Sequence, residues 1–596
     1  MKKSFDLFKQ VSFSYRFCAD NQNRVLMPIA ITAIISLALP LLANYYNKGI
    51  IEAISCKMDI HMFLKNMFLW SGILLLLEII SLLSQYVLSR KNRRLRNSIV
   101  ERINFLRMSV PYEKTLDLNY QKSLSVARLS MDKKVPCVVN VQLAVVGLIT
   151  SVVCCCTYMV LISKLHWAIV VAVIISYIGM YVCGTINAKH TRVFRELLIP
   201  VQRKIAYVAG RSGNVQAAKD IRVYGMENWF SSKYEQFSDE KEQIIEKRQQ
   251  VEHTGRIVNA LLVFARSLVS YIVLIFLYMK QTISIDDFVF FIGLVTAFST
   301  TLSKVQENIQ LLHDSCLDVC DYMFFEEEST YTSQDATTNS QLPNEIETIK
   351  FEHVSFRYPE SVDDVINDIC FEVRKNEKLG LVGLNGAGKT TLILLMCGLL
   401  QPTEGKVLLN GRDVREFGAD AYLSLFSAVF QDISLLPVSV RENIILGNEC
   451  PGHLQITELI RECGLEHIDL DAKFIQEIHR NAICLSGGEL QRFALVRAMH
   501  KPHEVLILDE PTAALDPLAE KNLYLNYGQY SEGKISVFIS HRLASTAFCD
   551  NVIMLEKGTI IERGTHAQLM ELGGKYKEMF EVQRSYYSEH LGGGLV

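Results

Sequence analysis

The sequence contains 15 cysteines but no Cys-x-x-Cys pair and no Cys/His spacing that fits a zinc site. This absence argues against a disulfide framework and against a zinc-finger domain. The formal net charge is only -3, so the chain also lacks the basic excess of a protein built to bind nucleic acid. No nucleic-acid partner is predicted.

The cysteines that do cluster are not arranged to hold a metal ion. Cys154, Cys155 and Cys156 are adjacent within an apolar run, and neighbouring helix positions point in different directions. Cys316 and Cys320 are one helical turn apart, yet no His or carboxylate is spaced to complete a site. We expect these cysteines to be reduced or buried in lipid.

Targeting and processing signals are also missing. The first apolar run is too long for a secretory signal, and no clear cleavage site follows it, so we expect it to stay in the membrane. No peptidase-like Cys/His domain precedes that run, so cleavage of a leader peptide by this chain is not expected. Without organelle-targeting, disulfide or glycosylation patterns, a bacterial plasma membrane is the expected location.

Long apolar runs are abundant in the first half of the chain. A chain of 596 residues is too long for one core, because single cores rarely exceed about 250–300 residues. Each run is near the ~20 residues that a helix needs to cross a bilayer. The six predicted spans are 25–46, 67–88, 142–163, 167–186, 257–279 and 288–305.

The distribution of basic residues predicts the orientation of these spans. Lys and Arg are frequent between the second and third spans and between the fourth and fifth. The loops 164–166 and around Lys280 carry few charges. Because cytoplasmic loops are enriched in Lys and Arg, both termini are predicted to be cytoplasmic. The charged, helix-patterned segment 189–256 predicts that helices extend from the membrane into the cytosol.

Ionisable residues inside predicted spans are candidates for function. Glu78 is in the middle of the second span and Arg266 is at a similar depth in the fifth. Three alternatives remain open. The two side chains pair inside the bundle, Glu78 lines a substrate cavity, or they face a polar crevice without touching substrate.

The second half has the mixed, glycine-punctuated composition of a soluble α/β domain. Residues 326–345 are polar, which is typical of a linker. The predicted organisation is therefore a transmembrane domain over 1–325, a linker over 326–345 and an ATP-binding domain over 346–596.

A phosphate-binding loop follows a predicted strand that begins at Lys378. The pattern G-x-x-x-x-G-K-T, between a strand and a helix, lets backbone N–H groups surround phosphate oxygens. Lys389 would neutralise the β- and γ-phosphates, and the Thr390 hydroxyl would contact Mg²⁺. The candidate ATP-binding residues of this loop are Gly383, Asn385, Gly386, Gly388, Lys389, Thr390 and Thr391.

A second acidic motif, Asp509-Glu510, ends a buried-strand run that begins at Val505. In phosphoryl transfer, an Asp at such a strand end holds Mg²⁺ and an adjacent Glu polarises the attacking water. ATP and Mg²⁺ are therefore the predicted cofactors.

The segment Leu485-Ser486-Gly487-Gly488-Glu489 resembles the signature of ATP-binding-cassette (ABC) proteins, and it precedes the acidic motif as in that family. The resemblance implies roles for further residues. Tyr358 would stack on adenine, Gln431 would contact Mg²⁺ and the attacking water, and His541 would contact the γ-phosphate. Ser486, Gly487 and Gly488 would complete the ATP site of a second chain, and Asp516 lies in a loop that communicates between paired ATPases.

Six spans before the ATPase domain, and the segment 217–227, resemble half-transporters of the exporter subfamily. The resemblance implies an all-α six-helix transmembrane domain, followed by an α/β P-loop ATPase domain with a helical subdomain. It also implies a dimer that exports or flips an amphipathic drug, lipid or peptide. A homodimer is expected, and a heterodimer and an ATP-gated regulator or channel remain open.

Two departures from the family pattern stand out. Glu489 ends the signature where Gln is commoner. The segment 479–484 lacks the glycine-and-glutamate pattern that many exporters show there, which leaves the details of coupling open.

Overall fold

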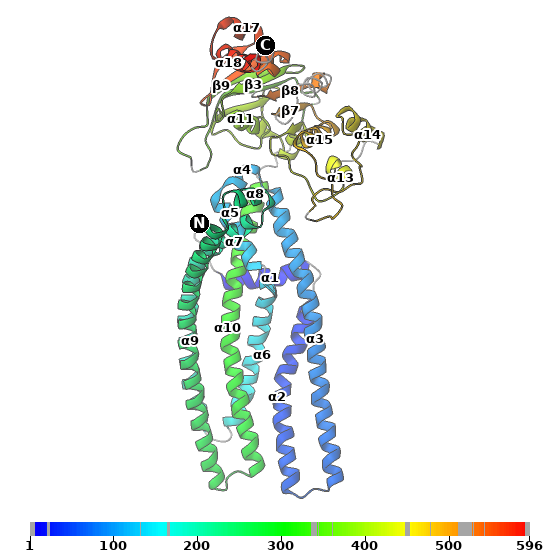
Figure 1. The fold of residues 1–596 in the computed structure, drawn as a ribbon. Helices are drawn as coiled ribbons and strands as arrows, with labels where there is room; N and C mark the ends of the chain where they lie inside the picture. The colour runs from blue at the N-terminus through cyan, green and yellow to red at the C-terminus, as the bar shows by residue number, and fades with distance from the viewer. Residues whose placement is uncertain are drawn as a thin grey trace. The chain divides into compact units, whose positions relative to one another are not determined.

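The computed structural model describes most of the chain, and its contacts divide that chain into two units (Figure 1). The first unit comprises residues 1–108 and 119–328, and the second comprises 109–118 and 329–596. The described residues are 6–20, 24–131, 133–163, 167–334, 342–343, 345–359, 361–447, 453–476, 478–510, 527–528, 530–540 and 543–589.

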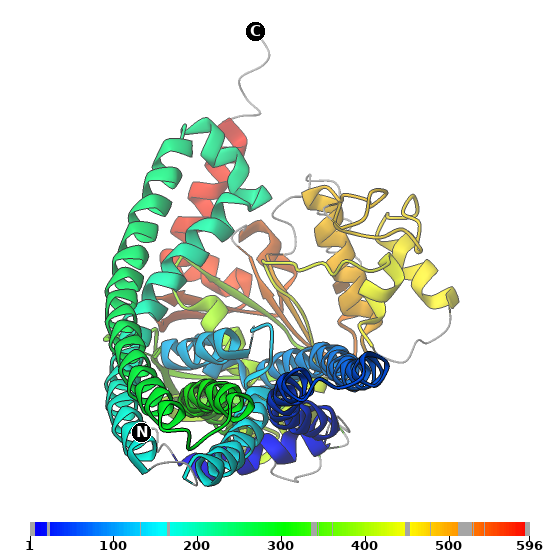
Figure 2. The same cartoon turned by 90° about the horizontal axis from the view of Figure 1, so that it is seen from below.

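The first unit is built from long helices, which Figure 2 shows nearly end-on. They are α1 (Leu7–Asp20), α2 (Leu26–Ser55), α3 (Ile60–Ser109), α5 (Leu118–Met131), α6 (Cys137–Ser163), α7 (Trp167–Ser212), α8 (Val215–Val223), α9 (Glu227–Met279) and α10 (Ile285–Gln334). Five of the six predicted spans lie within one of these helices, and the first begins one residue before α2.

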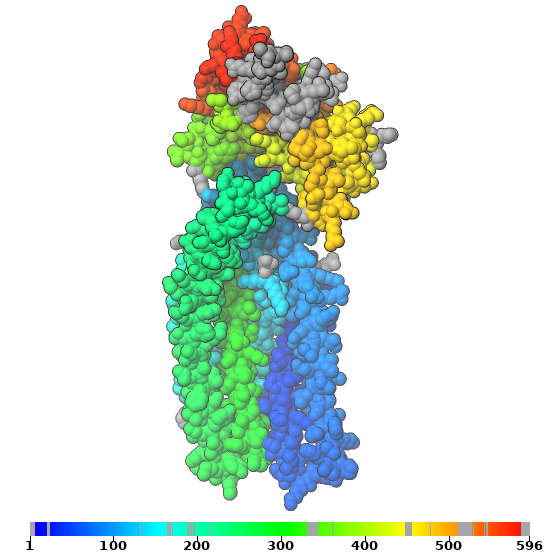
Figure 3. Space-filling model, in the orientation of Figure 1, coloured from blue at the N-terminus to red at the C-terminus, as the bar shows by residue number. Residues whose placement is uncertain are grey.

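Five of these helices, α2, α3, α6, α9 and α10, are long and apolar enough to cross a membrane. The fourth predicted span lies in α7, where the apolar stretch of described residues runs from Val171 to Ile186. Many large apolar side chains of α3 and α9 are exposed. Figure 3 shows the surfaces of these two helices in blue and green. A helix that is apolar on all sides is typical of a membrane span or a buried core.

Polar contacts tie the helices to one another. The Ser84 hydroxyl on α3 donates to the Pro28 carbonyl on α2 at 2.9 Å. The Gln142 amide on α6 donates to the Ser14 carbonyl on α1 at 3.2 Å. The Phe17 ring on α1 packs edge-on against Tyr322 on α10, with ring centroids 6.0 Å apart. The contacts of Ser14 and Phe17 hold the short helix α1 against the bundle.

Helix α10 continues to Gln334 and so extends into the segment predicted as a linker. Arg102 forms an ion pair with Glu326 at 3.3 Å, and the Ser123 hydroxyl donates to Glu328 at 2.8 Å. Ser329 is fully buried. The polar composition of residues 326–334 therefore reflects ion pairing and hydrogen bonding along a helix.

The second unit contains two β-sheets and is an α/β domain. Its strands are β1 (Thr348–Phe356), β2 (Ile366–Arg374), β3 (Lys378–Gly383), β4 (Glu404–Leu409), β5 (Arg412–Asp413), β6 (Phe426–Val429), β7 (Val505–Asp509), β8 (Ile535–Ile539), β9 (Asn551–Glu556) and β10 (Thr559–Gly564). The order is β2-β1-β4-β5 in the antiparallel sheet and β10-β9-β3-β8-β7-β6 in the mainly parallel one.

Helices cover the sheets and form a separate helical part. They are α11 (Lys389–Met396), α12 (Ala419–Ser424), α13 (Val440–Ile445), α14 (His453–Glu462), α15 (Gly487–His500), α17 (His566–Leu572) and α18 (Lys575–Glu589). Helices α13 and α14 pack on α15. The fold class predicted from the sequence, a helical region followed by an α/β ATPase domain, is confirmed.

One short segment of the first half belongs to the second unit. Helix α4 (Tyr112–Leu116) lies within residues 109–118, which group with the ATPase fold. Leu116 packs against the core cluster of that fold, and the Gln401 N–H donates to Glu113 at 3.3 Å. Sequence composition placed this segment in the transmembrane domain, because a helix of five residues carries no signal of the surface on which it docks.

The core between the two sheets yields a stability prediction. Phe351 is 1% exposed and stacks on Phe371 with ring centroids 4.5 Å apart. We expect Phe351→Ala to destabilise the ATPase domain by about 3–5 kcal/mol, because it removes this packing and leaves a cavity. The thermal midpoint of the purified protein measures the loss. Leu572→Ala is the control, since Leu572 is 66% exposed, and equal shifts for both variants would contradict the prediction.

Candidate nucleotide site

The candidate site lies at one edge of the larger sheet. Strands β3, β8, β7 and β6 are adjacent and parallel, so their carboxyl ends meet at the same edge. The phosphate loop follows β3, the acidic pair ends β7, and Gln431 comes shortly after β6. Ligands of open α/β sheets bind beyond the carboxyl ends of their strands. The topology therefore gathers motifs that are far apart in the sequence.

Glycines give the phosphate loop its shape. Gly383, Gly386 and Gly388 have positive φ angles of 149°, 79° and 102°. A Cβ at Gly383 would lie 2.3 Å from the Leu555 carbonyl oxygen. The loop ends at Gly388, which caps the N-terminus of α11 and so directs the free N–H groups of that helix toward the loop.

Lys389 is held inside this loop. Its Nζ donates to the carbonyls of Gly383 at 2.8 Å and Leu384 at 3.1 Å. Burial lowers the pKa of Lys389, while the nearby carboxylates of Glu510 and Asp509 act in the opposite direction. A partly desolvated ammonium group beside a helix N-terminus is well suited to contact phosphate oxygens.

Asp509 and Thr390 lie together beside Lys389. Burial and the charge of Glu510 raise the pKa of Asp509 to about 6, and a hydrogen bond from Thr390 and the charge of Lys389 oppose that rise. Hydroxyl and carboxylate oxygens are the ligands that Mg²⁺ prefers. The donor set of Thr390 and Asp509 therefore fits the predicted metal.

Glu510 occupies a backbone conformation that is uncommon for a residue with a side chain. Its φ is 53°, and its N–H donates to the Ile539 carbonyl at the end of β8 at 3.0 Å. Its own carbonyl accepts a hydrogen bond from the Gln491 amide on α15 at 3.4 Å. Residues held in such conformations by their surroundings cluster at active sites. Gln491 was not predicted as a site residue, and its sequence position gives no signal of this contact.

Tyr358 and Gln431 differ in their relation to the phosphate loop. The Tyr358 hydroxyl is 3.1 Å from the Thr391 hydroxyl, and its ring packs edge-on against Phe356. Gln431 is exposed in the loop that follows β6. The structure thus connects Tyr358 directly to the phosphate loop, while Gln431 shares only the edge of the sheet.

The signature segment forms the start of α15. Ser486 is the N-cap, and its hydroxyl and N–H both donate to the Glu489 carboxylate, at 2.7 and 2.8 Å. His467 lies 2.8 Å from the same carboxylate. Hydrogen bonds from Ser486, and then His467, lower the pKa of Glu489 to about 2. Glu in place of the commoner Gln therefore completes a capping box.

Three other predicted features have different outcomes. Asp516 and His541 lie outside the described residues. In the segment 479–484, the Ile483 N–H donates to the Lys473 carbonyl at 2.9 Å, and His479 lies 3.0 Å from the Pro437 carbonyl. Backbone contacts thus hold this segment against the helical part despite its unusual sequence.

Glu78 and Arg266 do not pair within the described part of the chain. Glu78 is exposed on α3, whereas Arg266 on α9 is 2% exposed and donates to the Ser176 hydroxyl at 3.3 Å. The Arg266 Nε and Nη2 atoms are buried without a hydrogen-bond partner. Depth along a span was the only sequence signal for pairing, and it does not specify which side of the helix a residue occupies.

A cavity of about 820 Å³ lies between α7, α9 and α10 in the first unit, and its wall combines polar side chains with apolar ones such as Val263 and Phe264. Amide, hydroxyl and charged side chains make up much of its wall, which includes Glu252, Arg256, Asn259, Ser267, Ser303, Gln306, Glu307 and Gln310. The Oδ1 of Asn259 and the Oε1 of Gln306 are buried and have no hydrogen-bond partner among the described residues. Sequence reasoning did not identify this cavity, because its residues come from three separate helices.

Comparison with known proteins supports the interpretation of the site at the edge of the larger sheet as an ATP site. Residues 366–513 match the model of the ABC transporter domain family. The subtilin transport ATP-binding protein SpaT of Bacillus subtilis is 28% identical over 397 residues, which cover 64% of this chain and 63% of that protein. An ATP-dependent lipid A-core flippase of Alkalilimnicola ehrlichii is 37% identical over 238 residues, covering 39% of this chain and 40% of the flippase. The chain therefore matches 63% or less of the length of these relatives.

A solved structure shares the fold over nearly the whole chain. A bacterial Atm1-family ABC exporter with ATP bound superposes with a TM-score of 0.77 and 18% sequence identity. The match covers 94% of this chain and 98% of the exporter. At this level of identity the comparison establishes the fold.

The raised pKa of Asp509 predicts a pH-dependent stability. A carboxyl with a raised pKa stabilises the folded state in its protonated form, and this stability is lost as the pH rises through about 6. In buffer free of nucleotide and Mg²⁺, Asp509→Asn should therefore raise the thermal midpoint more at about pH 8 than at about pH 4. The gain in the free energy of unfolding should be larger at the higher pH by on the order of 2 kcal/mol. Asp363→Asn, at an exposed position, is the control, and a pH-independent effect of Asp509→Asn would disprove the assignment.

Proposed function

We propose that this chain, an ABC transporter with its transmembrane region fused to its ATPase domain, is one half of an ATP-driven exporter. The observation that carries the proposal is the acidic pair Asp509-Glu510 beside Lys389 and Thr390, in a chain that also contains apolar helices long enough to cross a membrane. A channel or regulator gated by ATP would share these features. Accumulation of substrate in sealed vesicles separates the two functions.

Each of the proposed site residues has a separate role in ATP hydrolysis. The phosphate loop and Lys389 hold the phosphates, and Tyr358 contacts the adenine. Thr390 and Asp509, with Gln431 from the same edge of the sheet, would hold Mg²⁺, which would neutralise charge on the phosphates. Glu510 orients the attacking water and takes up its proton, and its position is set by the bonds to Ile539 and Gln491. His541 contacts the γ-phosphate.

A second copy of the chain completes each site. Ser486 lies at the N-terminus of α15, where free backbone N–H groups favour an anion. We infer that Ser486, Gly487 and Gly488 of one chain contact the ATP held by the phosphate loop of the other, with Asp516 in the loop between the paired domains. A homodimer is proposed because this chain carries both Glu510 and His541.

The segment 109–118 supports a route for mechanical coupling. It contacts the ATPase fold through Glu113 and Leu116, and it follows directly on the long helix α3. Movement of the ATPase domain would therefore act on the end of a stiff helix. The basic loops place this end, and both termini, in the cytoplasm, and the plasma membrane is the proposed location.

The mixed polar and apolar wall of the cavity between α7, α9 and α10 supports a peptide, which carries both backbone amides and apolar side chains, as the proposed substrate. Its carboxamides offer both donors and acceptors, and the unpartnered oxygens of Asn259 and Gln306 can accept from amide N–H groups. The Arg256–Glu252 ion pair adds charge of both signs. The alignment with the subtilin transport protein spans 397 residues, which is longer than the segment 345–596, so it includes part of the membrane region.

The role of Glu510 is tested by Glu510→Gln in lipid nanodiscs. We expect the ATPase rate to fall by at least about 10²-fold, because the base that orients water is lost, while ATP binding is kept. Glu532→Gln is the control, because Glu532 is an exposed glutamate in the same domain. A variant that hydrolyses ATP at the wild-type rate would refute the assignment.

The cavity is tested by replacing its amides with a residue of similar size. For Asn259→Leu and Gln306→Leu, we expect the peptide concentration that half-maximally stimulates ATPase activity to rise roughly tenfold, as one or two hydrogen bonds are lost. Gln85→Leu, on the exposed surface of α3, is the control. Unchanged stimulation in both cavity variants would exclude the cavity as the peptide site.

A further inference from the structure

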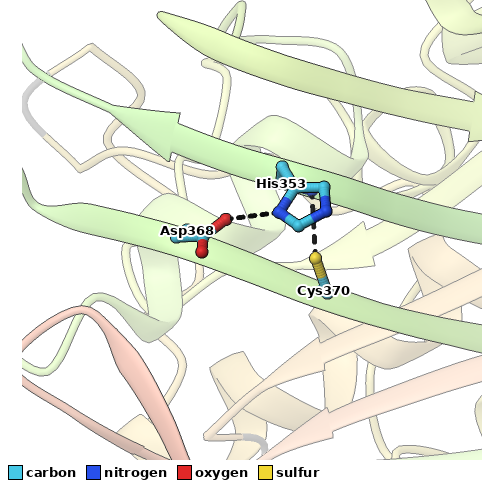
Figure 4. A group of neighbouring side chains, drawn as sticks. All are labelled: His353, Asp368 and Cys370. Atoms are coloured by element: carbon cyan, nitrogen blue, oxygen red, sulfur yellow. Dashed lines mark hydrogen bonds and ion pairs between the residues drawn. The ribbon is translucent and has the colours of Figure 1, made fainter.

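A group of three potential metal ligands lies on the antiparallel sheet of the ATPase unit. His353 is on β1, and Asp368 and Cys370 are on β2 (Figure 4). One ligand atom from each residue lies within 4.8 Å of the other two. All three side chains are exposed, and they belong neither to the phosphate loop nor to the signature.

Two irregularities in strand pairing bring these residues together. Phe351 pairs with Phe371 and Val354 with Ile369, so that two residues of β1, including His353, oppose the single residue Cys370. This arrangement is a β-bulge.

The next stretch of the pairing bulges on the opposite strand. Val354 pairs with Ile369 and Phe356 with Ile366, so that two residues of β2, including Asp368, oppose the single residue Ser355. The second bulge restores the register that the first one shifted. Together the two bulges bring the imidazole, the carboxylate and the thiol to one surface.

Both bulges hold a residue with a side chain in the left-handed region. The φ angle is 50° at His353 and 43° at Asp368. Gly405 on β4 accommodates the first bulge, because a Cβ there would lie 2.1 Å from the His353 carbonyl oxygen. Strained residues of this kind cluster at active sites and ligand clamps. The lack of a side chain at Gly405 thus leaves the space that the bulge at His353 occupies.

The contacts within the group already orient the three donors. His353 Nδ1 lies 2.7 Å from Asp368 Oδ1, and the His353 N–H donates to the Cys370 sulfur at 3.1 Å. The thiolate is the form of cysteine that binds metals. The imidazole and the carboxylate therefore face each other with the sulfur beside them.

We propose that His353, Asp368 and Cys370 form a Zn²⁺ site that links β1 to β2. Sulfur, nitrogen and oxygen together suit Zn²⁺ and not Mg²⁺ or Ca²⁺, which take oxygen ligands. Bonds of about 2.0–2.3 Å to one ion bring ligand atoms to roughly 3–4 Å of each other. Exposed side chains reach this spacing by rotation, and solvent supplies the fourth ligand.

Metal binding at this site exchanges protons for metal bonds. The Cys370 S–H bond breaks and its proton passes to solvent, while the sulfur electron pair forms the bond to Zn²⁺. The proton in the hydrogen bond between His353 Nδ1 and Asp368 passes through solvent to the Nε2 atom of His353, so that Nδ1 and the carboxylate each form one bond to the metal. No oxidation or reduction takes place. The ion would stabilise the paired bulges of the folded sheet.

Co²⁺ is the probe for the test, because its complexes with thiolate absorb in the near ultraviolet. Full-length protein without an affinity tag, in nanodiscs, is titrated with Co²⁺ and then with Zn²⁺. We expect a thiolate-to-cobalt band that Zn²⁺ abolishes and Mg²⁺ does not, with one ion bound per chain at this site. Zn²⁺ should also raise the thermal midpoint of the wild-type protein.

Matched variants assign the band to this site. Cys370→Ser should remove the band and the Zn²⁺-dependent thermal shift, and Cys56→Ser, at another exposed cysteine, should keep both. His353→Asn should weaken Co²⁺ binding while preserving the bulge, because Asn tolerates the left-handed region. A band that survives Cys370→Ser, or no band in the wild type, would overturn the proposal.

Discussion

The parallel pairing of β3, β8, β7 and β6 is the constraint on which the nucleotide site depends. Parallel strands need crossover connections, so their carboxyl ends collect at one edge even when long segments separate them in sequence. Thr390 of the phosphate loop and Asp509 of the acidic pair are 119 residues apart in sequence (509 − 390), yet a hydrogen bond joins them. The charges gathered at this edge create its chemistry. Lys389 lies near the carboxylates of Asp509 and Glu510, and burial disfavours the ionised forms of Lys389 and Asp509.

Much of this arrangement could be predicted from the sequence, because its parts are local. The phosphate loop, the signature and the acidic pair are short patterns, each with a strand or helix beside it, and apolar runs of sufficient length indicate spans. Parts set by tertiary contacts could not be predicted. The polar stretch after Glu326 is helical through Gln334 because Arg102 and Ser123 bind its carboxylates. Arg266 donates to the Ser176 hydroxyl instead of pairing with Glu78, because packing decides which side of each helix faces the bundle.

Strand register was the other quantity beyond the reach of the sequence. His353 and Asp368 lie on different strands, and a shift of one residue would send either side chain to the opposite face. Two bulges, each unpredictable from local composition, place them together with Cys370. Cysteine and histidine spacing failed to reveal a metal site for the same reason. Spacing rules describe ligands that one turn or one loop brings together, whereas these ligands meet across a sheet.

The segment 109–118 has a consequence for how the protein is made. The chain passes from the first unit to the second at residue 109, returns at 119, and enters the second unit again at 329. Leu116 needs a core that includes Ile349 and Phe351, which are synthesised much later. At about 5–20 residues per second, the ribosome needs roughly 10–50 s to reach β1. During that interval the apolar face of α4 has no partner from its own fold, which makes this short helix a natural point for chaperone contact in biogenesis.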